Sequence, residues 1–406
     1  MGAFVHKPAR WDKEAAKLWR DGQRHEAFAK ALATFREMPE PDADAYIQPA
    51  FYMFQLDRFE EAVTILEQGY KAFPKHPMML LSLGSSYNRA GRHQQAIPHL
   101  ERFLGLGHAD PSAFDALASS HAETGNFIKA RIFGLMALNA KDKATAHRHG
   151  SPALNLGIRP GGKRKVIAFT LFGSRPRYLR GALHNVLAAR ELYPGWTCRF
   201  YVDDSVDGVL QQALRDEGAE LVRDESGNRD LRHLLTRRFQ VADDPEVGRF
   251  MVRDCDSVVN KREAAAVAEW IESGQPFHVM RDWWTHTDPM LAGMWGGMSG
   301  VYPNLGERLA AFLDEKPFNS NWDQYFLREE VWPAIREHVV VHDRCFSSHR
   351  AQPFPTPTPD GLEHVGQNEY AGDKQAQAER LAPFGKRIPA LKLPIVKPIK
   401  LQFRTG

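Results

Sequence analysis

A spacing of 34 residues recurs through the first third of this 406-residue chain and constrains its fold more than any other feature. Each copy has apolar residues at helical spacing between a turn residue and a proline or polar break. Identical residues recur one period apart at Ala62, Ala96 and Ala130, at Leu83 and Leu117, at Gly91 and Gly125, and at Pro77 and Pro111. A further position of the repeat is occupied by Phe59, His93 and Phe127. Such a period is typical of arrays in which helical units pack on their neighbours.

These copies resemble the tetratricopeptide repeat, a helix–turn–helix unit of about 34 residues. Three copies are clear, and an earlier one over residues 22–41 fits with one inserted residue. We therefore predict a helical solenoid over residues 10–145, within an N-terminal domain of residues 1–150; an unrelated helical bundle is the alternative. The concave face of such an array suits binding of an acceptor or a protein partner.

The pattern changes after residues 151–164, a basic stretch rich in Gly and Pro that we predict to be a linker. We expect the parts on either side of it to be separable. From residue 165 to about 370, short apolar runs such as 165–173 and 196–204 alternate with helical patterns such as 176–194. This order predicts an α/β domain with a mostly parallel sheet. Ligands of such sheets bind at the carboxyl ends of the strands, where Gly173, Asp203 and Asp254 fall.

Composition excludes several classes of protein. The net charge of +3 lacks the basic excess of a dedicated nucleic-acid binder. The sequence shows no signal peptide and no apolar run long enough for a transmembrane segment. Three scattered cysteines (Cys198, Cys255 and Cys345) favour a reducing compartment. We expect a cytoplasmic protein, either free or peripheral at the inner face of the membrane.

The C-terminal tail, residues 371–406, has eight Lys or Arg against two Asp or Glu. It also contains several prolines, and we expect it to be extended. It could wrap the preceding domain or touch an acidic surface, and a solvated tail is the alternative.

Two carboxylates, Asp254 and Asp256, follow the apolar run Phe250–Val252 and stand two residues apart. Hard divalent cations prefer oxygen ligands, and a cation held there could bridge the phosphates of a nucleotide. Turns are also rich in Asp, so the pair taken by itself favours a capping turn before the helix predicted at Lys261–Ser273.

The wider segment resembles the Asp-x-Asp region of GT-A glycosyltransferases, especially bacterial sugar transferases of capsule and surface-glycan pathways. The resemblance spans residues 163–370 and is most specific over 253–297. The matching residues are Arg253, Asp254, Asp256, Ser257, Arg262, Glu263, Ala266, Val267, Glu269, Trp270, Phe277, His278, Met280, Arg281, Asp282, Leu291, Gly293, Met294, Trp295 and Gly296. This resemblance implies a Rossmann-like, nucleotide-sugar-binding domain with Mn²⁺ or Mg²⁺ held by Asp254 and Asp256.

The chemistry also resembles that of glycosyltransferase family 8, whose members pair Asp-x-Asp with a later Asp-Gln and a late metal-binding His. Asp323 and Gln324 match the Asp-Gln, although Asp323 could simply cap a helix. His342, at the end of a predicted strand, is the expected third metal ligand, and His364 is its rival. The family's His-x-x-Gly-x-x-Lys-Pro-Trp signature is absent at both sites.

Further residues are expected around the donor sugar nucleotide. They are Phe172, Gly173, Tyr178, Arg238, Arg253, Gly296 and Gly297. Gly173 would let backbone approach the nucleotide. Tyr178 could equally belong to the core, and Arg238 could equally lie on a solvated face.

The function expected is transfer of a sugar from a UDP- or GDP-sugar to a glycan or protein acceptor, as in polysaccharide biosynthesis. The Asp-Gln pair favours retention of configuration, whereas inversion would need a carboxylate base such as Asp282. Two alternatives stay open: a repeat-based scaffold with an inactive transferase domain, and a nucleotidyltransferase. The second would usually carry a Gly-rich loop near the first strand, which residues 171–181 match poorly.

Overall fold

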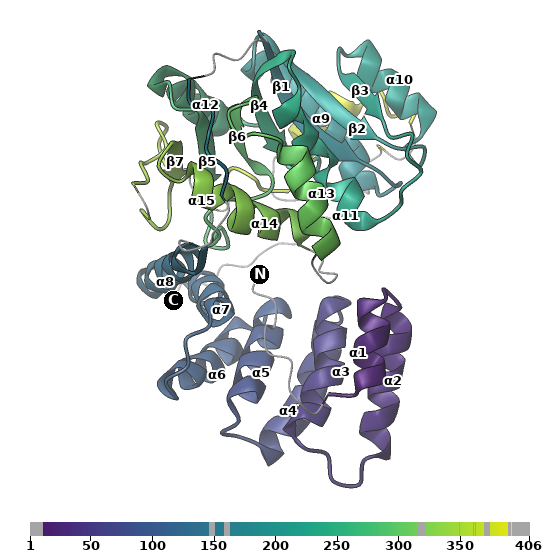
Figure 1. Ribbon diagram of the computed structural model, residues 1–406, viewed down its shortest axis with the longest axis vertical. Coiled ribbons are helices and arrows are strands. Elements are labelled where there is room, and N and C mark those ends of the chain that lie inside the picture. The colour runs from purple at the N-terminus through teal and green to yellow at the C-terminus, as the bar shows by residue number, and fades with distance from the viewer. Residues whose placement is uncertain are drawn as a thin grey trace.

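The computed structural model describes residues 11–145, 151–157, 163–315, 321–348, 350–359, 361, 363–368, 374–388 and 391. Its N-terminal part is an array of helices stacked in pairs (Figure 1). The helices are α1 (Lys13–Arg20), α2 (Arg24–Glu37), α3 (Ala43–Gln55), α4 (Phe59–Ala72), α5 (Pro77–Arg89), α6 (His93–Gly105), α7 (Pro111–Glu123) and α8 (Phe127–Thr145). The predicted helical-repeat region is confirmed.

The repeat period is visible in the helix starts, since α4, α6 and α8 begin at Phe59, His93 and Phe127. The turns before α6 and α8 hold Gly91 and Gly125 at φ of 75° and 81°, which favours glycine. The recurring alanines Ala62, Ala96 and Ala130 are fully buried, as small residues must be where helices pack closely. The array is therefore built as its repeating residues predict.

The second part is a seven-stranded sheet with the order β3-β2-β1-β4-β6-β5-β7. Its strands are β1 (Arg164–Leu171), β2 (Trp196–Val202), β3 (Glu220–Arg223), β4 (Val247–Arg253), β5 (Phe277–Arg281), β6 (Met294–Met298) and β7 (Val339–Asp343). All neighbouring strands pair in parallel except β6, which runs antiparallel to β4 and β5. The sheet is thus mixed, as the expected "mostly parallel" arrangement allows.

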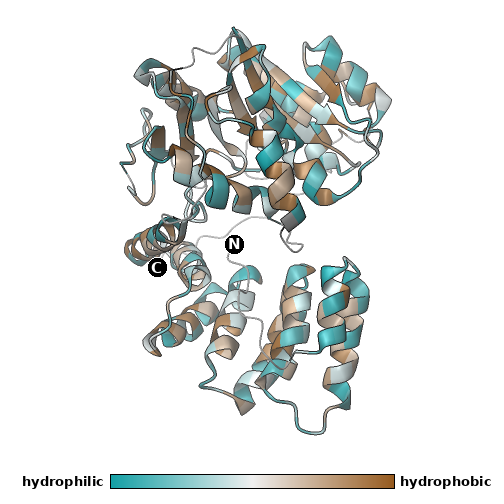
Figure 2. Cartoon of the chain, viewed as in Figure 1, coloured by the Kyte–Doolittle hydropathy of each residue, from teal (hydrophilic) through white to brown (hydrophobic). Residues whose placement is uncertain are grey.

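Helices cover both faces of this sheet. They are α9 (Pro176–Leu192), α10 (Gly208–Asp216), α11 (Leu231–Thr236), the 3₁₀ turn η1 (Arg237–Asp243), α12 (Lys261–Ser273), α13 (Leu305–Glu315), α14 (Trp322–Phe326), the π-helical turn η2 (Leu327–Val331), α15 (Trp332–Ile335) and α16 (Lys374–Leu381). Alternate residues of β1 face opposite cores, with Ile167 and Phe169 toward α9 and Val166 and Ala168 toward η1. Figure 2 shows these central strands mostly in brown and tan.

Strand order reverses beside β1. The chain passes from β1 outward through β2 and β3, and then returns to form β4 on the other side of β1. The helices that leave neighbouring strands in opposite directions open a crevice at such a switch point, beyond the carboxyl ends of the strands. Gly173 and Asp254 lie just beyond those ends of β1 and β4, so the fold places the predicted site at its switch point.

The helical array and the sheet domain are in direct contact through α8 (Figure 1). Buried Lys141 on α8 donates to Thr287 O at 2.9 Å and ion-pairs with Asp288 at 3.2 Å. Trp332 Nε1 donates to Asp142 at 2.6 Å. Phe346 lies so close to Gly134 that an added Cβ would meet its ring at 2.0 Å. These contacts join the parts that we expected to be separable into one packed unit.

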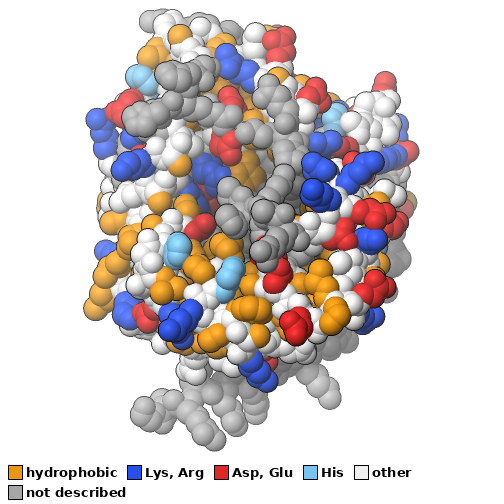
Figure 3. Space-filling view, turned by 60° about the horizontal axis from the view of Figure 1, so that its bottom comes forward, with side chains coloured by type: hydrophobic (Ala, Val, Ile, Leu, Met, Phe, Trp, Pro, Cys, Tyr) orange, Lys and Arg blue, Asp and Glu red, His pale blue; other side chains and the backbone are white. Residues whose placement is uncertain are grey.

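Charged side chains on the face drawn in Figure 3 are interspersed in sign, in keeping with the small net charge. In the described part of the chain every helix is too short or too polar to cross a lipid bilayer.

Candidate functional site

The acidic turn Asp254–Ser257 follows β4 and is held in place from α9. The Asn185 side chain donates to Cys255 O at 3.2 Å and to Ser257 O at 3.1 Å, and accepts from Val259 N at 3.0 Å. Gly181, one turn earlier on α9, packs so closely that an added Cβ would lie 1.9 Å from Cys255 O. The backbone that presents the two carboxylates is therefore rigidly seated.

Arg238 lies buried at the centre of the site and connects its acidic residues. Its guanidinium donates to Arg253 O at 2.8 Å, ion-pairs with Asp254, and donates to Asp323 at 3.2 Å. Its own backbone N–H donates to Thr170 Oγ1 at the end of β1. From the sequence, Arg238 could either contact the donor or lie on a solvated face. In the structure it is buried and joins the ends of β1, β4 and α14.

Negative charge is concentrated around this arginine. Burial, together with the neighbouring Asp254, raises the pKa of Asp256. Burial also raises the pKa of Asp323, although Arg238 opposes the effect. The Asp254 side chain is half exposed, whereas that of Asp256 keeps 16% of its surface and lies 3.5 Å from Arg177. The turn therefore has the carboxylate crowding that a bound cation would relieve.

Gln324 ties the loop between β5 and β6 to α14. Its side-chain nitrogen donates to Met290 O, and its side-chain oxygen accepts from Ala292 N at 3.1 Å. Three residues after Met290, Gly293 lies against Asp254, where an added Cβ would be 2.1 Å from Oδ2. Asp323 and Gln324, expected to be catalytic, thus border the acidic turn, one through Arg238 and the other through this loop.

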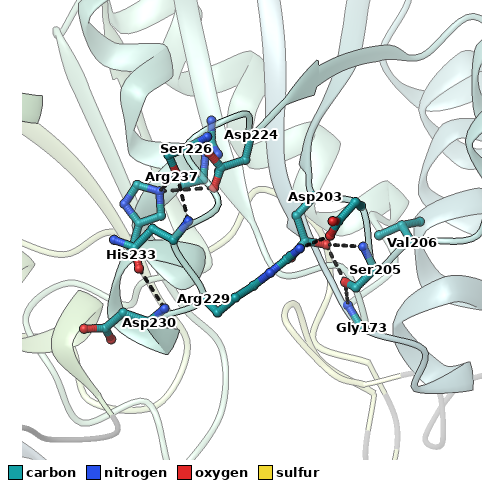
Figure 4. A network of polar contacts seen from close by, with 12 residues as sticks. Gly173, Asp203, Ser205, Val206, Asp224, Ser226, Arg229, Asp230, His233 and Arg237 are labelled. Carbon is teal, nitrogen blue, oxygen red and sulfur yellow. Dashed lines mark hydrogen bonds and ion pairs between the residues drawn. The ribbon is translucent and has the colours of Figure 1, made fainter.

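A polar network that sequence reasoning largely missed continues from Gly173 (Figure 4). Gly173, at φ 72°, donates its N–H to Ser205 Oγ at 2.6 Å. Ser205 in turn binds Asp203, which also pairs with Arg229 at 2.5 Å. The sequence pointed to Asp203, because an acidic pair ends the predicted strand. No sequence pattern pointed to Arg229.

Other expected donor residues take varied positions. Phe172 and Tyr178 are half buried beside the ends of β1 and α9, and the Arg177 guanidinium lies 4.5 Å over the Tyr178 ring. Arg253 points into the interior, where it ion-pairs with Glu263 at 2.6 Å and donates to Trp295 O. Its guanidinium joins strand to helix instead of facing the crevice.

Gly296 and Gly297, expected to line the sugar pocket, lie within β6 in the middle of the sheet. An added Cβ would meet Phe250 O at 2.6 Å from Gly296 and the ring of Phe277 at 2.9 Å from Gly297. Their lack of a side chain is explained by packing against neighbouring strands and the core.

Asp282, the base considered for inversion, has no exposed surface. Its Oδ2 accepts from Arg262 Nε at 2.9 Å and from Val365 N at 2.8 Å, and its Oδ1 accepts from Arg262 Nη2 at 3.1 Å. Both oxygens therefore have internal partners that fasten the 363–368 segment to the sheet.

The two rival histidines are in different surroundings. His342 is fully buried on β7; His278 lies 2.8 Å from its Nδ1 and Glu269 3.1 Å from its Nε2. His364 stacks on Trp283 in a segment whose Asn368 forms a β-bridge with Ser257 of the acidic turn. No group of three His, Cys, Asp or Glu arranged to hold a metal occurs among the described residues. The three expected ligands are thus not gathered in this structure.

No family model and no curated protein matches the chain. Among solved structures, MamA from Desulfovibrio magneticus RS-1 is 20% identical over 33% of this chain and 77% of its own, with a TM-score of 0.30. A mutant O-GlcNAc transferase from Thermobaculum terrenum is 16% identical over 55% of this chain and 42% of its own, with a TM-score of 0.33. The chain therefore spans less than half of that transferase.

A third neighbour is a glycosyltransferase involved in glycosylation of the major capsid of PBCV-1, 15% identical over 54% of this chain and 99% of its own, with a TM-score of 0.33. The neighbours thus include two glycosyltransferases. At these TM-scores the similarity carries no functional argument, which must come from the site itself.

Proposed function

We propose that the chain is a glycosyltransferase of the GT-A kind that takes its sugar from a nucleotide-sugar donor and uses Mn²⁺ or Mg²⁺. The observation that carries this proposal is the junction of Asp254, Arg238 and Asp323 at the switch point of the sheet. That point is where open α/β sheets bind nucleotides. There the guanidinium of Arg238 lies between the carboxylates of Asp254 and Asp323.

The residues of the acidic turn fit a divalent cation in part. Asp254 and Asp256 offer oxygen ligands from one rigid turn. Burial, together with the neighbouring Asp254, raises the pKa of Asp256, which supports the proposal of a cation at this turn. Two carboxylates leave the remaining positions to donor phosphates and water. When bound, such a cation offsets negative charge on a departing nucleoside diphosphate.

The chain's own residues supply positioning and charge. We propose that Arg238 releases part of its contact with Asp254 as the donor binds and then faces the diphosphate, since a guanidinium suits phosphate oxygens. Asp323 stays beside the sugar, and Gln324 holds the loop that closes over it. Gly173 leaves backbone room for the nucleoside at the end of β1. Inversion would need a free carboxylate base, and Asp282 is buried with both oxygens already bound. Asp323 remains near the acidic turn, so we favour retention of configuration.

The direct test is hydrolysis of UDP-sugars and GDP-sugars by the purified protein with Mn²⁺, which detects donor use without a known acceptor. Slow, Mn²⁺-dependent release of UDP or GDP is expected. Replacement of Asp254 or Asp256 by Asn should abolish release while the melting temperature stays near that of the wild type. Undiminished release by both variants at saturating donor would overturn the assignment.

One observation favours the alternative of an inactive transferase domain on a scaffold. Arg238 already neutralises Asp254 and Asp323, which is the charge that a cation would otherwise neutralise. If no nucleotide sugar raises the melting temperature with Mn²⁺, the scaffold becomes the better description, because a ligand of the folded state must raise it.

A further inference from the structure

An apolar stripe is exposed along α8, the last helix of the array. Its members, Phe127, Ile128, Ile132 and Met136, keep 54%, 78%, 51% and 41% of their surface exposed. The last three stand four residues apart, so they lie on one side of the helix. The opposite side of α8 is buried against α7 and the sheet domain. The helix is thus apolar on two sides, and such a helix is ordinarily covered on both.

We propose that the α8 stripe docks the protein on the surface of an anionic lipid bilayer, with the helix lying in the plane of the headgroups. The area of the stripe, the charge that borders it and the aromatic pair at its start each support a lipid partner. Docking there does not depend on the glycosyltransferase function proposed above, since the stripe contains none of the residues of the acidic turn.

The stripe is too small for a stable contact with a second folded chain. With about 200 Å² for a fully exposed large side chain, its four members leave on the order of 450 Å² uncovered. A stable protein interface buries about 800 Å² on each partner. A bilayer needs no matching surface, because its attraction for a helix grows with the apolar area that enters the headgroup region.

Basic side chains border the stripe. Lys129, Arg131 and Lys143 are exposed, and at 3.6 residues per turn they fall on the same half of α8 as the stripe. Lys129 already forms an ion pair with α6, whereas Arg131 and Lys143 make no ion pair within the described part of the chain. The acidic residue of this helix, Asp142, is held by Arg336 at 3.1 Å. Two cations therefore remain for lipid phosphates.

The end of the chain has a composition that suits the same partner. Residues 392–406 lie outside the described residues, and they contain four Lys or Arg and no Asp or Glu. Apolar residues such as Leu393, Ile395 and Phe403 are interspersed with these charges. Clusters of basic residues of this size are attracted to anionic headgroups, so the tail would add to the attraction of α8.

An aromatic pair joins the stripe to the sheet domain. Phe127 stacks on Trp284 of the loop between β5 and β6, with ring centroids 5.4 Å apart and planes inclined by 23°. Trp284 is half buried, and tryptophan is enriched where apolar groups meet the headgroups. From the buried side of α8, Lys141 holds the same loop through Asp288. Docking through α8 would therefore orient both parts of the molecule on the bilayer.

The test measures flotation of the full-length protein with vesicles of phosphatidylcholine that contain about one third phosphatidylglycerol. Vesicles of phosphatidylcholine alone are the neutral control. We expect binding to the anionic vesicles at low salt, much weaker binding to the neutral ones, and a loss of binding as salt screens the phosphates.

Two pairs of variants separate the apolar from the basic contribution. Ile128→Glu places a charge in the stripe, and Val209→Glu makes the same change at an exposed position of α10, far from α8 in Figure 1. Arg131→Gln and Arg215→Gln, the latter also exposed on α10, form the second pair. We expect affinity for anionic vesicles to fall at least tenfold in Ile128→Glu, several-fold in Arg131→Gln, and in neither α10 variant.

All four positions are exposed, so each variant should keep the melting temperature of the wild type. Absence of binding to anionic vesicles, or an equal loss in Val209→Glu, would overturn the proposal. Undiminished binding by Ile128→Glu would also overturn it, because the contact would then belong to another basic segment. A dimer that dissociates in Ile128→Glu, in a protein that does not bind vesicles, would assign the stripe to a second copy instead.

Discussion

Gly293 shows how a single residue can fix the position of a neighbouring carboxylate, that of Asp254. A methyl group at this position would lie 2.1 Å from Oδ2 of Asp254, the exposed end of a flexible side chain. We therefore expect Gly293→Ala to displace Asp254 with little loss of stability, and to lower donor hydrolysis at least tenfold. The measurement is the rate of UDP release at saturating donor, together with the melting temperature.

Gly181→Ala is the informative comparison for that variant. Its added methyl would meet the backbone oxygen of Cys255 at 1.9 Å, and backbone cannot rotate away as a side chain can. The expected result is a clear loss of stability, on the order of 1–3 kcal/mol as for other overpacked sites. Equal melting temperatures in the two variants would contradict this account of the turn.

His184 predicts a pH dependence of stability. Its side chain lies buried between α9 and α16 with Nε2 3.2 Å from Gln377 O, and burial, assisted by Arg380, lowers its pKa to about 4. In the unfolded chain the pKa of this histidine is about 6.5. As the pH falls, the unfolded chain therefore binds the proton before the folded protein does. Stability from this group is therefore complete above pH 6.5 and is lost between pH 6.5 and about 4, by roughly 1–3 kcal/mol.

The measurement is the melting temperature from pH 8 to pH 4.5. His184→Gln should weaken the acid dependence over that window, whereas His25→Gln, at an exposed position on α2, should not. An unchanged slope in the first variant would show that another group governs acid stability.

At the scale of elements, the segments that contain His342 and His364 lead us to opposite predictions for the two histidines. Buried His342 contacts buried His278 and the partly exposed Glu269, which joins β5, β7 and α12. His364, in contrast, lies in the segment paired to the acidic turn. We expect His342→Ala to lower stability by about 1–3 kcal/mol, as loss of a buried hydrogen-bonded group does. We expect His364→Ala to raise the Mn²⁺ concentration needed for hydrolysis.

Titration of hydrolysis with Mn²⁺ distinguishes the two roles. A higher Mn²⁺ requirement in His342→Ala at an unchanged melting temperature would restore His342 as the third ligand. No effect from either substitution would leave the cation to the two aspartates, phosphates and water.

Elements with strong local patterns were predictable from the sequence. The helix Lys261–Ser273 has the bounds that its pattern indicated, because Asn260 caps its first turn and Gly274 ends it at φ 70°. The 34-residue register likewise fixed the packing of α4 to α8. The reversed strand β6 was not predictable, since Met294–Met298 contains two glycines and depends for its direction on β4 and β5.

The site was predictable where chemistry and strand ends coincide, and not where it depends on distant contacts. Asp254 and Asp256 stand out because acidic residues follow an apolar strand. The bridge from Arg238 to Asp323 joins residues 85 positions apart, and no local pattern records it. Similarly, nothing around His342 distinguishes a strand-end ligand from a buried partner of Glu269.

For the whole molecule, Lys141 is the residue that joins the two parts. It is fully buried on α8 and pairs with Asp115 of the array and Asp288 of the sheet domain. Those partners outweigh the effect of burial and raise its pKa, so it stays charged. The array therefore contributes the buried charge of Lys141 to the loop that reaches the acidic turn. The Gly/Pro-rich linker in the sequence gave no indication of this contact.

We predict that Lys141→Met destabilises the protein by about 3 kcal/mol, the lower end for a broken buried ion pair, because Asp115 loses its cation while Asp288 keeps Arg328 at 3.2 Å. Lys129→Met, on the same helix, removes an exposed pair with Glu101 at 2.7 Å and should cost at most about 1 kcal/mol.

Calorimetry of both variants and the wild type measures the difference. We expect one cooperative transition in the wild type and in Lys129→Met, and two in Lys141→Met as the array and the sheet domain uncouple. Two transitions already present in the wild type would show that the interface does not couple the parts. In that case donor hydrolysis should be indifferent to Lys141, whereas coupling through residues 282–293 predicts that it falls in Lys141→Met even below the first transition.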